Sequence, residues 1–167
     1  NIMPDLISIS KGLTGGFLPM GITLSTEKIF QSFISVSPKK TFWHGHSFTA
    51  NPLGCAAANA SLDLLENDPQ KYLSFSNKHI SCLENIKKLS FVKNIRVTGT
   101  ISAFDIDTGK SAGYLNNIGK KIKALSIEKG LFIRPLGDVI YLLPPLCITD
   151  HQIEKSYNII FKVLRDL

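Results

Sequence analysis

The chain has 167 residues, of which 44% are hydrophobic and 19% are charged, and its formal net charge is +6. This apolar content excludes a disordered chain, and no segment approaches the roughly 18 consecutive apolar residues of a membrane-spanning helix. The charge is uneven, because residues 69–130 hold 11 basic and 4 acidic side chains. Such a surplus indicates either an anionic partner or a lysine-rich surface in contact with water.

The first part of the chain predicts strands and helices joined by loops. In chain order we expect a strand over 5–10, a glycine-rich loop over 12–19, a strand over 21–25, a short helix over 27–33 capped by Thr26, a polar loop over 35–41 and a helix over 51–66. Both strands are near-continuous apolar segments, which is typical of strands buried in a larger parallel sheet. Asn51-Pro52 is the start signal of the last helix, since Asn caps it and Pro suits its first position.

From residue 69 the composition changes to a lysine-rich α+β pattern. The expected elements are helices over 70–89 and 112–129, strands over 92–98, 100–106, 131–134 and 139–143, and a final helix that begins at Thr149. Thr149 and Gln152 are spaced as a capping box. The final helix carries one apolar face, made of Ile153, Tyr157, Ile160, Phe161 and Leu164. We therefore expect two domains, residues 1–68 and residues 69–167.

Lys11 lies where an apolar strand meets the glycine-rich loop. A lysine there would stand at the carboxyl edge of a sheet, where α/β proteins bind their ligands. When it is partly desolvated, a lysine amine can attack a carbonyl group. The alternative is an ordinary surface lysine at the end of a strand.

Residues 42–52 combine aromatic side chains, Gly45, hydroxyl groups and a helix N-cap. Hydroxyls and free backbone N–H groups just before a helix make an anion site. His44 and His46 could also supply half of a metal site, but such a site needs three or four ligands and no third one is near in the sequence. We therefore expect a bound anion here and no metal.

Arg134 ends an apolar strand and is followed by Pro135. A guanidinium held in this way is suited to bidentate binding of a carboxylate. A structural ion pair would use the same fork geometry, so both interpretations stay open on these residues alone.

Three segments taken together resemble the class III aminotransferases, which are pyridoxal-phosphate enzymes. The segments are Asp5 to Gly16, which includes Ser10-Lys-Gly-Leu-Thr-Gly-Gly16, then His44-Gly-His-Ser-Phe-Thr-Ala-Asn-Pro-Leu-Gly-Cys-Ala56, and finally Arg134-Pro-Leu-Gly137. Their order and spacing both fit the family, and the resemblance covers essentially the whole chain. It implies an α/β protein of the PLP-dependent transferase fold type I, similar to aspartate aminotransferase. Residues 1–68 would be the end of the large PLP-binding domain and residues 69–167 the small C-terminal domain.

The resemblance also implies how the cofactor is held. Lys11 would bind pyridoxal 5'-phosphate covalently and would move the proton during transamination. Gly45, His46 and Ser47 would bind the cofactor's phosphate, and in this family that segment reaches the site of the neighbouring subunit, so the site belongs to a homodimer. The family usually has Thr at position 47, and Ser47 keeps the hydroxyl while losing the methyl group that restrains its rotamer.

The substrate residues follow from the same resemblance. Arg134 would bind a substrate carboxylate, and Gly45 and Tyr141 would line the same pocket. Within the class, residues 10–16 and 133–145 most resemble the members that transfer the amino group of S-adenosylmethionine to 8-amino-7-oxononanoate in biotin synthesis. The alternative within the class is an aminotransferase of the ornithine or 4-aminobutyrate type, which shares the first stretch more than the second.

A different class of function is a basic module that binds nucleic acid or another polyanion. Its support is the charge of residues 69–130, but the lysines there lack interleaved aromatic residues and any recognisable nucleic-acid motif. We therefore expect small-molecule substrates, with no nucleic-acid partner and no membrane partner.

The resemblance implies that the chain is part of a longer enzyme. Members of the family are far longer, and the aspartate that contacts the pyridine nitrogen, the glycine-rich phosphate loop and the aromatic residue that stacks on the ring would precede Asn1. We expect the C-terminal part alone to have no transaminase activity. Cys55, Cys82 and Cys147 show no C-x-x-C spacing, and a reduced, cytoplasmic compartment is their simplest interpretation.

Overall fold

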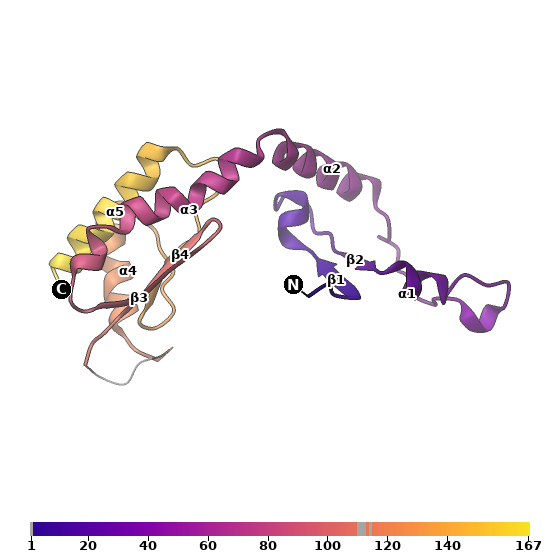
Figure 1. Cartoon of the computed structure of the whole chain (residues 1–167), viewed down its shortest axis with the longest axis horizontal. Coiled ribbons are helices and arrows are strands. Elements are labelled where there is room, and N and C mark those ends of the chain that lie inside the picture. Colours follow the sequence, from indigo (N-terminus) through magenta and orange to yellow (C-terminus); the bar gives the residue numbers. More distant parts are fainter. Residues whose placement is uncertain (1, 110–112, 114) are drawn as a thin grey trace. The chain divides into compact units, whose positions relative to one another are not determined.

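The computed structural model describes residues 2–109, 113 and 115–167, with the side chains of residues 71–73 outside the description. The chain divides into two compact units, Asn1–Asp68 and Pro69–Leu167. Figure 1 labels the α-helices and the strands β1 to β4.

The first unit contains a two-stranded sheet, two α-helices and two short 3-10 helices. In chain order these are β1 (Leu6–Ile9), η1 (Lys11–Thr14), β2 (Ile22–Ser25), α1 (Glu27–Gln31), η2 (Pro38–Lys40) and α2 (Pro52–Asn67). β1 pairs antiparallel with β2, so that Leu6 lies opposite Ser25 and Ile9 opposite Ile22. The expected helix start at Asn51-Pro52 is confirmed, because the Asn51 Oδ1 accepts a hydrogen bond from the Leu53 N–H at 3.0 Å.

Within this unit the strand expected over 5–10 is exposed and not buried. All four residues of β1 are exposed, and its neighbour in the sheet is an antiparallel strand. The physical reason is that a sheet of two strands has too little surface to bury its own apolar side chains. The apolar character of the segment was real, but burial depends on a second layer that this unit does not place on β1.

The second unit is a layer of helices on a three-stranded sheet. Its elements are α3 (Pro69–Leu83), η3 (Ile86–Lys88), β3 (Val92–Thr98), β4 (Ile101–Ile106), α4 (Ile118–Glu128), β5 (Val139–Leu142) and α5 (Asp150–Arg165). The strand order is β3-β4-β5, and both pairs are antiparallel. α3 and α5 pack against each other beside this sheet (Figure 1).

Two elements of the second unit differ from the expectation. The helix expected over 112–129 begins only at Ile118, because the Asn116 Oδ1 accepts a hydrogen bond from the Ile118 N–H and makes a turn before the helix; residue 112 lies outside the described residues. The strand expected over 131–134 is absent, and the isolated bridge between Leu136 and Val139 comes only after that segment. The reason is that β5 pairs along its length with β4, and Pro135 has no N–H with which to extend a ladder.

A third element is shorter than expected. The helix expected over 70–89 ends at Leu83, and the short 3-10 helix η3 follows after two residues. The C-terminal helix α5 agrees closely with the sequence, since Thr149 and Gln152 form both hydrogen bonds of the capping box.

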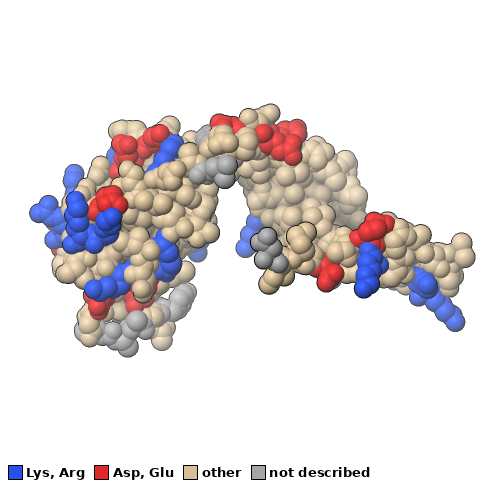
Figure 2. All heavy atoms as spheres, viewed as in Figure 1, with Lys and Arg blue, Asp and Glu red and all other residues tan. Residues whose placement is uncertain are grey.

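One hydrophobic core holds the second unit together. The three helices α3, α4 and α5 and the strands β4 and β5 each contribute a side chain that is at most 1% exposed: Phe75 from α3, Phe104 from β4, Ile122 from α4, Ile140 from β5 and Ile160 from α5. Of the expected apolar face of α5, Ile153, Tyr157, Ile160 and Leu164 are buried, whereas Phe161 is partly exposed. The basic surplus stays at the surface, where acidic groups are interspersed among the lysines and arginines (Figure 2).

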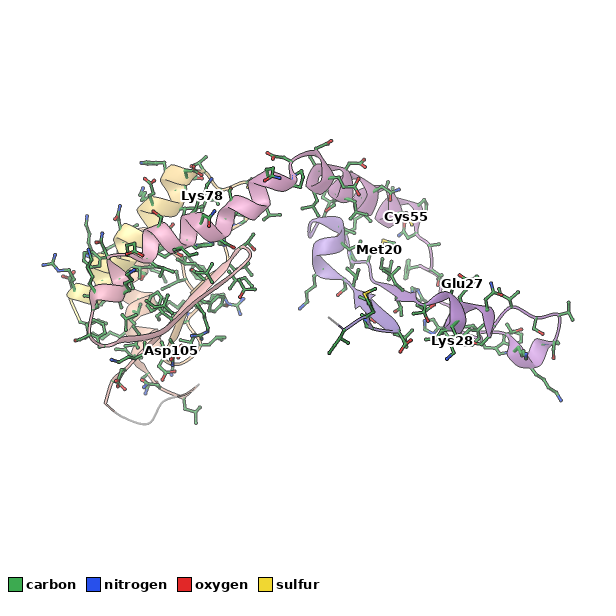
Figure 3. All side chains as sticks on the ribbon, in the orientation of Figure 1. Met20, Glu27, Lys28, Cys55, Lys78 and Asp105 are labelled. Atoms are coloured by element: carbon green, nitrogen blue, oxygen red, sulfur yellow. The ribbon has the colours of Figure 1, made fainter. Side chains whose placement is uncertain are left out.

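Several of these surface charges are paired. Ion pairs join Lys78 of α3 to Asp150 of α5, Arg96 to Asp105 at 2.8 Å, and Lys129 to Asp166 at 3.5 Å. Lys78 and Asp105 are labelled in Figure 3. Exposed pairs of this kind contribute about 0–1 kcal/mol each, so the core is what stabilises the unit.

A polar chain crosses the core. The His79 Nδ1 lies 2.6 Å from the Tyr157 hydroxyl, which lies 2.5 Å from the Ser102 Oγ, and the His79 Nε2 lies 3.0 Å from the carbonyl oxygen of Thr100. His79, Ser102 and Tyr157 are all buried. Burial lowers the pKa of His79 below its ordinary value of 6.5, although the hydrogen bond to Thr100 acts in the opposite direction.

Gly119 allows α4 to approach the turn before β5. Its N–H donates to the carbonyl oxygen of Gly137 at 3.0 Å. A Cβ at this position would overlap that same oxygen and would lie 2.8 Å from the Cβ of Pro135. The first turn of α4 therefore fixes the position of residues 135–137.

We predict that Gly119→Ala displaces the turn and lowers the free energy of unfolding by about 1–3 kcal/mol, the usual cost of overpacking. Chemical denaturation measures this loss. Lys120→Ala is the matched control, because Lys120 is the next residue of α4 and is exposed. Equal stability of the two variants would show that the contact between α4 and the turn is not close.

Because His79 stays neutral in the folded chain, we predict that the free energy of unfolding depends on pH. The unfolded chain takes up a proton at this side chain as the pH falls through 6.5, whereas the folded chain does so only at lower pH. Stability is therefore greatest above pH 6.5 and falls as the pH drops below it, down to the lowered pKa. Urea denaturation between pH 5 and pH 8 measures this slope.

The matched control for the pH dependence is His151→Gln, since His151 is exposed on α5. This control keeps the slope, whereas His79→Gln reduces it. A slope that survives His79→Gln unchanged would assign the proton uptake to another group.

Candidate functional site

Lys11 occupies a strained backbone position directly after β1. Its φ is +51°, in the left-handed region that residues with a side chain rarely adopt. Strain of about 1–3 kcal/mol persists only where the surroundings enforce it, and it is concentrated at functional sites. The Lys11 side chain is exposed, so the desolvation that a reactive amine needs is not provided by the described residues of this unit.

Two buried residues hold the loop in place. Leu13 and Thr14 are the buried residues of η1. The Thr14 Oγ1 donates a hydrogen bond to the carbonyl oxygen of Leu18 at 2.5 Å and accepts one from the Leu18 N–H at 3.4 Å. These bonds close the glycine-rich loop on itself. Sequence reasoning missed Thr14, although a hydroxyl residue inside an otherwise apolar and glycine-rich loop is a signal for such an anchor.

The loop packs against α2 through small residues. Gly54 and Ala58 are the buried residues of α2, and a Cβ on Gly54 would lie 3.1 Å from the Sδ of Met20. Met20 is labelled in Figure 3, as is Cys55, the residue of α2 that follows Gly54. The alanine-rich character of the helix therefore has a local cause, which is the close approach of the chain that follows Lys11.

An open hollow of about 790 Å³ lies in this loop. It is lined by Ser10, Lys11, Gly12, Gly15, Gly16, Leu18, Pro19 and Met20. A primary amine thus stands at a concave surface whose other lining is backbone and apolar side chains.

The segment before α2 is folded by its own hydrogen bonds. The His46 N–H donates to the Thr49 Oγ1 at 3.0 Å, and the Phe48 N–H donates to the His46 Nδ1 at 3.1 Å. The Thr49 N–H donates to the carbonyl oxygen of His46 at 3.0 Å. Ala50, with φ +53°, then turns the chain into the N-cap of α2.

These bonds leave free donors at the tip of the segment. Among the described residues, the N–H groups of Gly45 and Ser47 and the Ser47 hydroxyl have no hydrogen-bond partner. A Cβ on Gly45 would meet nothing closer than the Thr49 Oγ1 at 4.0 Å. The arrangement suits an anion that accepts hydrogen bonds from the backbone.

The His46 ring helps to fold the segment before α2, because its Nδ1 accepts a hydrogen bond from the Phe48 N–H.

Across the part of the chain that the structure describes, no three His, Cys, Asp or Glu side chains are grouped in a way that could hold a metal ion.

Arg134 and Tyr141 belong to the second unit. Arg134 is exposed in the extended segment before the turn, and Tyr141 lies on β5 opposite Ala103 of β4. Leu136 and Val139 face each other across the turn, and Arg134 and Tyr141 each lie two residues beyond this bridge along the chain. Among the described residues, no ion pair involves Arg134, which leaves its guanidinium available for a ligand.

Sequence reasoning also missed Phe132, which is 68% exposed two residues before Arg134, with the buried Ile133 between them. The Lys123 Nζ lies 5.1 Å from the centre of its ring, so the ring is held by a cation–π contact. No local signal marked Phe132, because it and the buried Ile133 are both apolar in the sequence.

The structure therefore places the four candidate groups in two sets. Lys11 and the Gly45–Ser47 segment lie in the first unit, both before α2. Arg134 and Tyr141 lie in the second unit, before and after the turn at 135–138. Among the described residues, no hydrogen bond or ion pair joins Lys11 to the segment or Arg134 to Tyr141.

Comparison with known sequences places this arrangement among aminotransferases. The family model described as aminotransferase class-III matches residues 1–164. The adenosylmethionine-8-amino-7-oxononanoate aminotransferase of Synechococcus elongatus is 46% identical over 166 residues, which are 99% of this chain and 39% of that protein. The protein of the same name from Geobacter sulfurreducens is 37% identical over 164 residues, covering 92% of this chain and 35% of that protein. The chain thus spans less than half of the length of these relatives.

Solved structures give the same result for the fold. The crystal structure of adenosylmethionine-8-amino-7-oxononanoate aminotransferase from Methanocaldococcus jannaschii matches 98% of this chain and 39% of its own, with a TM-score of 0.86 and 31% identity. An amine transaminase from an uncultivated Pseudomonas species, solved in its PLP-bound form, matches with a TM-score of 0.82 and 24% identity, covering 98% of this chain and 38% of its own. The expected α/β fold of the PLP-dependent transferases of fold type I is confirmed.

We predict that Asn51→Ala frees the segment before α2 and lowers the free energy of unfolding by about 1 kcal/mol, the usual cost of a lost N-cap. Thermal denaturation measures the change, and Asn51→Ser restores most of the stability. Thr26→Ala is the matched control, because Thr26 occupies the N-cap position of α1 without a side-chain capping bond. Equal losses at the two caps would contradict the role assigned to Asn51.

Proposed function

The chain belongs to the class III aminotransferases, and from this we propose that it is the C-terminal part of an enzyme that transfers the amino group of S-adenosylmethionine to 8-amino-7-oxononanoate. The observation that carries the proposal is the 46% identity, over 99% of the chain, to the Synechococcus elongatus protein named for that reaction. In this proposal residues 1–68 end the large cofactor-binding domain and residues 69–167 form the small domain.

The cofactor of the family is pyridoxal 5'-phosphate, which supplies an electron sink for the carbon that loses or gains its proton. The residues of this chain fit that group. Lys11 presents a primary amine at an open hollow, and Gly45 and Ser47 present free N–H groups that suit a phosphate. We assign the phosphate contact to Gly45, His46 and Ser47.

Lys11 has two tasks in this proposal. Its Nζ would hold the cofactor covalently, and the same amine, once free, would carry the proton to and from the substrate carbon. The strained backbone at Lys11 holds the base of the side chain, while the bonds of Thr14 to Leu18 keep the loop from relaxing. Since Lys11 is exposed in its own unit, we assign the exclusion of water to parts of the enzyme beyond this chain.

Arg134 binds the substrate carboxylate in this proposal. A guanidinium with no ion pair among the described residues is available for bidentate hydrogen bonds. Phe132 and Leu136, both exposed on either side of Arg134 along the chain, would contact the aliphatic part of 8-amino-7-oxononanoate. Tyr141 and Gly45 would line the same pocket.

A homodimer completes the proposed site. The segment that carries Gly45 exposes large apolar side chains, including Trp43 at 81%, Phe48 at 75% and Leu53 at 68%. Contiguous exposed apolar surface of this kind usually marks an interface. We assign it to a second copy of the subunit, whose cofactor phosphate the Gly45–Ser47 segment would reach.

We also propose a cytoplasmic location, which the three free cysteines support. Within the described ranges, every helix is too short or too polar to cross a bilayer.

The test of the proposed function uses the full-length enzyme and its Lys11→Ala variant. We expect the variant to lose the absorbance of covalently bound cofactor and at least about 10²–10⁴-fold in kcat, the usual contribution of a positioned proton carrier. Lys28→Ala is the matched control, because Lys28 is an exposed lysine of α1. Retained cofactor absorbance and turnover in Lys11→Ala would contradict the assignment.

The amino donor is decided by mass spectrometry of the product with each donor in turn. We expect 7,8-diaminononanoate to form with S-adenosylmethionine as the donor. Product formed only with ornithine or 4-aminobutyrate would contradict the assignment of S-adenosylmethionine as the donor. The 167-residue chain by itself, supplied with cofactor and both substrates, is expected to give no turnover.

A further inference from the structure

The chain of hydrogen bonds through His79, Tyr157 and Ser102 has no role in the proposed chemistry, yet it is the most completely buried polar group of the second unit. The three side chains are 0%, 3% and 1% exposed, and each belongs to a different element: α3, α5 and β4. A buried polar group is costly unless all its hydrogen bonds are made. Here the bonds are made, so the cost is offset only in one relative position of the three elements.

The direction of the chain follows from its ends. The Thr100 carbonyl can only accept, so the His79 Nε2 donates to it across 3.0 Å. The Nδ1 of a neutral ring then accepts from the Tyr157 hydroxyl at 2.6 Å. The Tyr157 oxygen in turn accepts from the Ser102 hydroxyl at 2.5 Å. Burial favours this neutral form, since it lowers the pKa of His79 and raises that of Tyr157.

Ser102 connects this chain to the strand that carries Tyr141. Ser102 lies opposite Leu142 of β5, and the next residue, Ala103, lies opposite Tyr141. Successive side chains of a strand point to opposite faces, so the bond that draws Ser102 into the core directs Ala103 and Tyr141 to the other face of the sheet. That face is the one on which Ala103 also lies opposite Arg96 of β3.

The hydrogen bond of Ser102 is directional, whereas the contacts of its apolar neighbours on β4 are not. Phe104 and Ile106 anchor β4 in the core by apolar contact, which is non-directional. The Ser102 side chain is small and polar, so apolar contact does little to hold it in the core. Its hydrogen bond to Tyr157 depends strongly on distance and angle. The end of β4 that pairs with Tyr141 is therefore held by a directional contact.

We propose that the His79–Tyr157–Ser102 chain is a positioning device for Tyr141, and through the turn at 135–138 for Arg134, in the substrate site. This inference rests on the proposed function, because it takes Tyr141 and Arg134 as substrate-binding residues. His79, Tyr157 and Ser102 are positioning residues that do not touch the substrate. Loss of the chain loosens the pairing of β4 with β5 and weakens substrate binding without removing any group that carries out the reaction.

The experiment uses Tyr157→Phe in the full-length enzyme, which removes one hydroxyl and keeps the ring in the core. We expect the KM for 8-amino-7-oxononanoate to rise about five- to tenfold, the equivalent of one lost hydrogen bond, while kcat stays within about twofold because Lys11 is untouched. Hydrogen exchange, followed by mass spectrometry, is expected to quicken at the amides of residues 139–142. Ser102→Ala is the second variant, which cuts the chain at its end and serves if Tyr157→Phe does not fold.

Two controls separate positioning from stability. Ile160→Val removes one methyl group from the same helix and the same core, so it lowers the melting temperature without cutting the chain. Ser126→Ala removes a buried serine hydroxyl that has no partner among the described residues. Both are expected to leave the KM and the exchange of residues 139–142 unchanged.

Arg134→Ala distinguishes failure of the inference from failure of the proposed function. If Arg134→Ala raises the KM and Tyr157→Phe does not, the positioning role is wrong. If Arg134→Ala leaves the KM unchanged, the substrate assignment is wrong, and the exchange at residues 139–142 alone decides whether the chain holds β5. Exchange there that is equal in Tyr157→Phe and Ile160→Val would overturn the inference in either case.

Discussion

The packing of α5 against the sheet is the interaction on which the second unit depends. Ile153, Tyr157, Ile160 and Leu164 recur at helical spacing and are all buried in the same core as Phe104 of β4 and Ile140 of β5. Each fully buried side chain of this kind contributes about 1.5–3 kcal/mol, which is several times the contribution of an exposed ion pair. This apolar core supports strand β5, which carries Tyr141, while the contact of Gly119 with Gly137 holds the turn that follows Arg134.

The first unit is organised by a different constraint, the close approach of the Lys11 loop to α2 at small residues. Its buried side chains are few, and the contact between the Lys11 loop and α2 is made by Leu13, Thr14, Gly54 and Ala58. Small residues allow that approach, and the hydrogen bonds of Thr14 maintain it. Large apolar side chains of the unit remain exposed instead, as at Phe17, Trp43 and Phe48. This contrast fits a segment whose apolar surface meets other polypeptide in the proposed enzyme.

The two halves of the proposed site therefore differ in how they are held. The amine of Lys11 and the free N–H groups of Gly45 and Ser47 are positioned by loops whose conformation is set by local hydrogen bonds and positive φ angles. Tyr141 is positioned by the regular sheet of the second unit, and Arg134 lies between the buried Ile133 and the turn at 135–138. A proposed catalytic amine thus sits on a strained loop, and the proposed carboxylate-binding groups sit on a rigid support, as the precision of bidentate binding requires.

The sequence by itself determined the features that depend on neighbours within about four residues. The cap at Asn51-Pro52, the capping box of Thr149 and Gln152 and the apolar stripe of α5 are all of this kind. Tertiary structure alone decided the exposure of β1, the absence of a strand over 131–134 and the hydrogen bonds of His79. The physical reason is that a strand exists and is buried only through partners elsewhere in the chain, and His79 meets Tyr157 across 78 residues of sequence, where no local spacing records the contact.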